Sequence, residues 1–88
     1  MDKIIEAMEN EYQKIYECRE KIEELNKKKV ELKPRLWEEA SGTVDQKKDY
    51  IKSRTSDYDM DIHLLEARIE YSYNIIKVLD YKMVYCDE

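Results

Sequence analysis

Three aspartates at alternate positions, Asp57, Asp59 and Asp61, form the one stretch of the sequence with the spacing of metal ligands. An EF-hand calcium loop opens in this way, with glycine at its sixth position and a bidentate acid at its twelfth. Here the sixth position is Ile62 and the twelfth is Arg68. We therefore predict that these carboxylates bind no metal and form a solvated face of a helix.

Other catalytic arrangements lack their partner residues. His63 is the only histidine, and neither Cys18 nor Cys86 lies near it in the chain, so a zinc site or a nucleophile–histidine pair is not available. No Glu-x-x-His motif supports a di-metal helical bundle, and the single glycine excludes a glycine-rich phosphate loop. The sequence predicts a protein without catalysis, cofactor or metal.

The basic run Lys27-Lys28-Lys29 is the feature closest to a nucleic-acid site. Small helical-hairpin dimers can bind RNA along a basic face, so RNA binding is one alternative function. The whole chain, however, has 21 acidic and 16 basic residues and a net charge of −5. General nucleic-acid binding needs a basic surface. We therefore expect the run to be solvated and disfavour nucleic acid as a partner.

A heptad repeat must position all of these residues. Steps of alternately four and three residues follow two series. The first series is Ile4, Met8, Glu11, Ile15, Cys18, Ile22, Leu25, Lys29, Leu32, Leu36 and Glu39. The second series is Val44, Lys48, Ile51, Thr55, Tyr58, Ile62, Leu65, Ile69, Ser72, Ile76, Leu79, Met83 and Cys86. A mainly apolar repeat of 3.5 residues is typical of a helix packed along another helix.

One turn divides the two series. Gly42 supplies the left-handed conformation that ends a helix, and Thr43 with Gln46 fits the capping box that begins the next one. We predict a single helical-hairpin domain over residues 1–88, with helix 1 at about 2–40, a turn at 41–43 and helix 2 at about 44–86. Pro34 is expected to kink or break helix 1. The fold class is all-α, an antiparallel two-helix coiled-coil hairpin that pairs into a four-helix bundle.

Polar residues at the contact positions either fix the register of the helices or lie at a solvated edge, and the sequence leaves both open. In such a hairpin Ser72 faces the region of Glu11, and Thr55 faces the region of Lys29. Cys18 lies roughly 30 Å from Cys86, since each helical residue advances 1.5 Å, so no disulfide within the chain is expected.

Apolar residues outside the contact positions predict a second interface. Tyr50, Leu64, Tyr71, Val78 and Tyr85 recur at intervals of seven or fourteen, and helix 1 has a similar excess at its start. The start of helix 1 and the end of helix 2 are neighbours in a hairpin, so we expect one Tyr-rich interface at the open end. Its predicted partner-binding residues are Ile5, Tyr12, Tyr16, Leu64, Tyr71, Ile75, Val78 and Tyr85.

The predicted partner is a second copy of the chain or another helical protein. No apolar run approaches the roughly 20 residues needed to span a membrane, and the first residues lack the apolar core of a signal peptide, so a cytoplasmic location is expected. We expect a non-catalytic protein–protein interaction module, serving as an adaptor, assembly or regulatory protein. A phage- or virus-type inhibitor that blocks the surface of a host protein is an alternative.

The sole tryptophan lies just before the turn, in Leu36-Trp37-Glu38-Glu39-Ala40-Ser41-Gly42. This layout resembles the WXG100 (ESAT-6-like) class of secreted helical hairpins, which pair into four-helix bundles and carry Trp-x-Gly at the turn. Here Gly42 follows Trp37 by five positions, and the Tyr-x-x-x-Asp/Glu tail of that class is absent. The resemblance implies a secreted hairpin partner as a further alternative, and no site residue is carried over. Trp37 itself is expected to cap the turn end.

Overall fold

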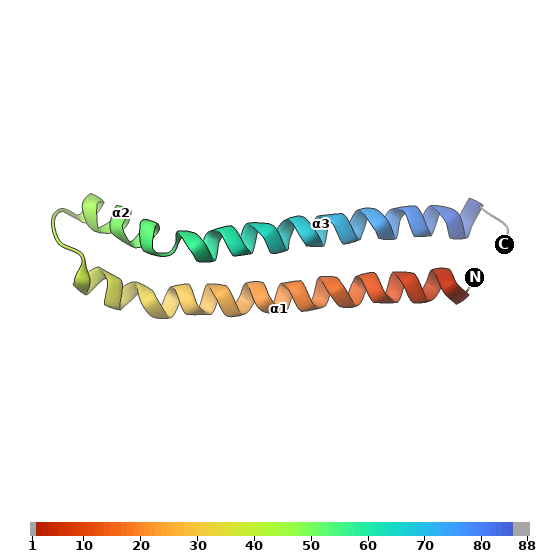
Figure 1. The fold of residues 1–88 in the computed structure, drawn as a ribbon, viewed down its shortest axis with the longest axis horizontal. Coiled ribbons are helices and arrows are strands. Elements are labelled where there is room, and N and C mark those ends of the chain that lie inside the picture. The colour runs from red at the N-terminus through yellow and green to blue at the C-terminus, as the bar shows by residue number, and fades with distance from the viewer. Residues whose placement is uncertain (1, 86–88) are drawn as a thin grey trace.

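The computed structural model describes residues 2–85 as three helices, α1 (Asp2–Glu39), α2 (Val44–Arg54) and α3 (Ser56–Tyr85), with no strand among them. Helices α1 and α3 lie side by side, and the first turn of α1 lies at the same end of the molecule as the last turn of α3 (Figure 1). The molecule measures 66 × 17 × 13 Å. The all-α prediction is confirmed, and the pairing of α1 with α3 fits a hairpin.

The heptad contact positions form the interface between the helices. The buried apolar side chains are Ile15, Cys18, Leu36, Ala40 and Ile76. The half-buried contact residues include Ile4, Met8, Ile22, Leu25, Leu32, Ile51, Ile62, Leu65, Ile69, Leu79 and Met83. The repeat thus predicts the packed side of both long helices. Cys86, the last predicted contact residue, lies outside the described residues.

Three polar contact residues, Glu11, Thr55 and Ser72, are buried, with Ser72 only 2% exposed. Ser72 lines the same groove as Glu11, and Thr55 lines the same groove as Lys29, so both predicted pairs of neighbours are found. Lys48 is exposed instead. Both alternatives for polar contact positions therefore occur: Glu11, Thr55 and Ser72 are buried between the helices, and Lys48 lies at a solvated edge.

Helix α1 continues through Pro34. Proline removes one backbone hydrogen bond and crowds the preceding turn. Leu32 and Leu36, on either side of it, remain half-buried and buried, so packing holds the helix in place across the defect. The break that the sequence left open does not occur, and the last turns of α1 incline from the rest of the helix (Figure 1).

The turn forms as expected. Gly42 has a φ of 103°, and both hydrogen bonds of the Thr43–Gln46 capping box are present. Gln46 N–H donates to Thr43 Oγ1 at 3.3 Å, and Thr43 N–H donates to Gln46 Oε1 at 2.9 Å. These bonds satisfy orphan backbone donors at the start of α2.

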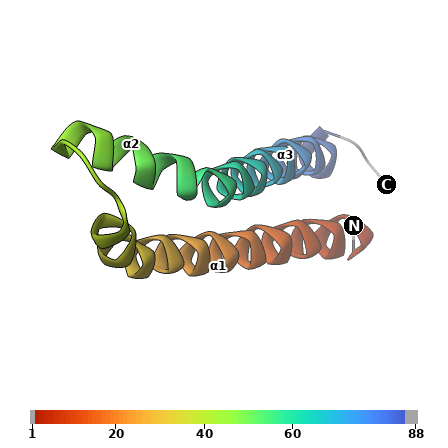
Figure 2. The ribbon, with the colours of Figure 1, turned by 60° about the vertical axis from the view of Figure 1, so that its left-hand side comes forward.

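The predicted single helix from 44 to 86 is divided at Thr55. The Thr55 hydroxyl donates to the Ile51 carbonyl at 2.9 Å, and the Ser56 hydroxyl donates to the Ser53 carbonyl at 2.8 Å. Such side-chain bonds to preceding carbonyls bend helices. As a result α2 inclines from the line of α3 (Figure 2). The early contact positions Val44 and Lys48 are exposed.

Candidate interaction surfaces

The eight predicted partner-binding residues are mostly exposed. Ile5, Tyr12, Tyr16, Leu64, Tyr71, Val78 and Tyr85 are exposed, and Ile75 is half-buried. Exposure of large apolar side chains at regular spacing is what a second interface requires.

The structure divides these residues between two faces. Tyr71 borders a groove with Lys14, Lys21 and Arg68, whereas Tyr12 borders a different groove that Tyr73 also lines. The α1–α3 contact separates the two grooves. Tyr12 and Tyr71 thus border different grooves, and the expected interface at the open end stays a prediction. The apolar residues outside the contact positions lie on one side of the contact stripe in α1 and on the other side in α3. A hairpin therefore does not bring the two sets together.

We name the first surface the Tyr71 face, defined by Leu64, Tyr71, Ile75 and Val78 of α3 and by the two grooves beside them. These grooves measure about 320 and 430 Å³ and share Lys21 and Leu65. Leu64, Tyr71 and Val78 are 69%, 66% and 54% exposed. Since positions seven apart share one side of a helix, the three side chains form an apolar column.

Charges of both signs lie along the Tyr71 face. The exposed charged side chains that line its two grooves comprise three bases and three acids. They are Lys14, Lys21, Arg68, Glu17, Glu24 and Asp61. The chain as a whole has a net charge of −5. With Glu11, whose lowered pKa favours the carboxylate, the face has three bases and four acids and is close to neutral on an acidic molecule.

Glu11 lies at the buried edge of this face. Lys14 Nζ donates to Glu11 Oε2 at 3.0 Å. This hydrogen bond, supported by the Ser72 hydroxyl, lowers the pKa of Glu11 despite the opposing effect of desolvation. The lowered pKa favours the carboxylate form of Glu11 at this contact position, and Ser72 of α3 lines the same groove.

We name the second surface the Tyr12 face, defined by Ile5, Tyr12 and Tyr16 of α1 and Tyr73 of α3. Arg19 spans it: its guanidinium donates to the Tyr73 hydroxyl and lies 5.8 Å from the ring centroid of Tyr73. The neighbouring Glu20 raises the pKa of Tyr16 by accepting its hydrogen bond. The contacts of Arg19 with Tyr73 bridge this face within the hairpin.

Tyr85 continues the spacing of Leu64, Tyr71 and Val78, but its ring contacts another residue of α3. Its ring packs against Tyr81 of the same helix, with 4.6 Å between the ring centroids. Part of its apolar surface is therefore used within α3.

A third surface, the lysine groove, was not predicted. It lies at the turn end and is lined by Lys29, Lys33, Lys48, Ile51, Lys52, Thr55 and Asp59, with a volume of about 360 Å³. Lys29 donates to Asp59 and thereby lowers the pKa of that carboxyl. The sequence signal was present, because lysine occupies contact positions on facing helices at Lys29 and Lys48.

Two aromatic rings near the turn, Trp37 and Tyr50, each make a cation–π contact. Lys47 Nζ lies 4.9 Å from the Trp37 ring centroid, and the Arg54 guanidinium lies 5.2 Å from that of Tyr50. Trp37 is 38% exposed, so it covers the turn end only in part.

Within residues 2–85, no group of three or more His, Cys, Asp or Glu side chains could hold a metal ion. Asp59 is paired with Lys29, and His63 Nδ1 lies 3.5 Å from Glu66 Oε1 on the surface. No helix in this part of the chain combines the length and the apolar character that crossing a membrane requires.

Comparison of the chain with protein families, curated proteins and solved structures finds no match. The surfaces described above are therefore the basis for any statement about function.

Proposed function

We propose that this protein is a non-catalytic protein–protein interaction module that acts through helix packing. Two antiparallel coiled-coil hairpins pair through their Tyr71 faces into a four-helix bundle. The exposed apolar column of Leu64, Tyr71 and Val78 carries this proposal. The cytoplasmic location expected from the sequence belongs to the same proposal.

The large surface of the chain supports a need for a partner. Its accessible area is 7193 Å² for a mass of 10.8 kDa. A compact monomer of this mass exposes about 5,500 Å². A single row of side chains between two helices buries too little apolar area to stabilise a domain well, and a second hairpin would extend that core.

Charge favours a second copy as the partner. A two-fold interface brings the same patch of both subunits together. The Tyr71 face, with three bases and four acids beside its apolar column, presents both signs to its copy. Lys14 and Lys21 then have carboxylates such as Glu17 within the facing patch, so opposite charges are available to pair across this face.

Light scattering after size exclusion tests the proposal on variants. We expect Tyr71→Glu combined with Val78→Glu to reduce the mass from a dimer to a monomer, because two charges would be buried without partners. Tyr12→Glu combined with Tyr16→Glu is the matched control. It adds the same charge on the opposite face and should leave the dimer intact.

Two results would overturn the proposal. One is a parent protein that is monomeric throughout the concentration range, which would leave the Tyr71 face for a different protein. The other is a Tyr71/Val78 variant with the same mass as the parent.

A further inference from the structure

We propose that the lysine groove and the adjoining Trp37 ring bind single-stranded nucleic acid. This site lies at the turn end, on other residues than the Tyr71 face, and does not depend on self-association.

Four ammonium groups line one groove with a single acid. Lys29, Lys33, Lys48 and Lys52 come from α1 and α2, and Asp59 pairs with Lys29. Like charges that face one another across two helices repel, and they are normally avoided at contact positions. A bound polyanion would neutralise the three remaining lysines and release their counterions.

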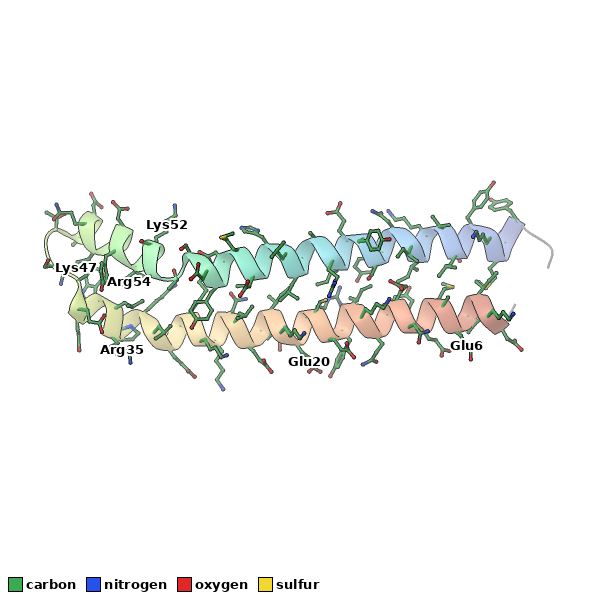
Figure 3. The ribbon with its side chains drawn as sticks, viewed as in Figure 1. Glu6, Glu20, Arg35, Lys47, Lys52 and Arg54 are labelled. Atoms are coloured by element: carbon green, nitrogen blue, oxygen red, sulfur yellow. The ribbon has the colours of Figure 1, made fainter. Side chains whose placement is uncertain are left out.

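Charge is also segregated along the molecule. Residues 27–54 contain nine basic and five acidic side chains, whereas the rest of the chain contains seven basic and sixteen acidic ones. Arg35, Lys47, Lys52 and Arg54 all belong to the turn end, on more than one side of it, while Glu6 and Glu20 lie along the other part of α1 (Figure 3). The basic turn end is not apparent from the net charge of −5 of the whole chain. Its electrostatic field would steer a polyanion to the turn and away from the open end.

The aromatic residues favour nucleic acid over other polyanions. Trp37 lies one turn after Lys33 on α1 and is partly exposed, and Lys47 lies against its ring. Proteins that bind single strands combine a positive groove for the phosphates with aromatic rings on which unpaired bases stack. A duplex hides its base faces, so a single strand fits this combination better.

Trp37 is the only tryptophan, so its fluorescence reports directly on the site. We expect saturable quenching of the full-length protein by both oligo(U) and oligo(dT) at about 20 mM salt. The logarithm of affinity should fall with the logarithm of salt concentration with a slope of about −2 to −3, because three or four lysines contact phosphates. Polyphosphate should compete without comparable quenching, since it has no bases.

Charge reversal locates the site. Lys48→Glu combined with Lys52→Glu should weaken binding at least about tenfold at low salt. Lys77→Glu combined with Lys82→Glu makes the same change in net charge on α3 and should leave affinity within about twofold. Trp37→Ala should weaken binding about tenfold, because base stacking on the ring is lost. Since this variant has no tryptophan fluorescence, its binding is measured by the anisotropy of a labelled oligonucleotide.

The proposal is overturned by any of three results. These are absence of saturable binding at low salt, equal loss of affinity in the two charge-reversal variants, and binding of anionic lipid vesicles without binding of either oligonucleotide. Circular dichroism of each variant would show that its helices persist.

Discussion

At the residue scale, a few polar side chains decide how the helices fit. Glu11, Ser72 and Thr55 occupy positions that a heptad repeat normally gives to apolar residues, and all three are buried. Lys14 and Ser72 provide Glu11 with partners, so its charge is tolerated. A buried polar group with specific partners penalises other registers of the two helices.

The ionised state of Glu11 gives stability a defined pH dependence. Its pKa is lowered from an ordinary value of 4.5, chiefly by Lys14, so the folded state favours the carboxylate. The resulting stabilisation is present above pH 4.5 and is lost as pH falls through the lowered pKa. The pKa of Asp59 is likewise lowered, chiefly by its hydrogen bond with Lys29, so this carboxylate also stabilises the fold less as the pH falls.

We therefore expect Glu11→Gln to lose less stability than the parent between neutral pH and about pH 3. Urea unfolding at a fixed protein concentration across this range measures the effect. The exposed Glu6→Gln is the matched control and should follow the parent curve. A Glu11→Gln curve parallel to that of the parent would show that Glu11 is not stabilised as its hydrogen bonds indicate.

At the element scale, the turn and the helix junction determine how far the heptad contact extends. The turn was predictable, because Gly42, Thr43 and Gln46 each have one dominant role at such a position. The division at Thr55 was not predicted, since the heptad repeat continues through it. Ser53, Thr55 and Ser56 form a cluster of short hydroxyl side chains that could have indicated it.

Gly42→Ala tests the turn. A Cβ at this residue would lie 2.0 Å from Gln46 Oε1, and the backbone φ of 103° is unfavourable for any side chain. The variant should lose about 1–3 kcal/mol of unfolding free energy through strain and loss of the cap.

Thermal and urea unfolding of Gly42→Ala should be compared with Ser41→Ala, an exposed neighbour outside the capping box. The control should change by no more than about 0.5 kcal/mol. Equal stability of the two variants would mean that the capping box contributes little to the hairpin.

The two-sided placement of the apolar residues also belongs to this scale. The sequence predicted the exposure of Tyr12 and Tyr71, because neither falls at a contact position. It did not place them on opposite faces, which depends on the side of the contact stripe on which each residue lies. The lysine groove is lined by residues of α1 and α2 and by Thr55, where the second half of the chain is divided, and a repeat alone does not specify that division.

At the scale of the whole molecule, a long and thin hairpin leaves much of its surface uncovered. The molecule is 66 Å long, and its buried apolar residues are few. One end is basic and the other is acidic. We infer a division of labour in which the Tyr71 face joins two copies and the turn end holds an anionic strand.

The absolute mass of the parent protein in solution, measured by light scattering over a concentration series, tests this self-association most directly. We expect a mass of twice 10.8 kDa that persists on dilution, together with a melting temperature that rises with protein concentration. A mass of 10.8 kDa at every concentration, with a melting temperature independent of concentration, would contradict pairing through the Tyr71 face.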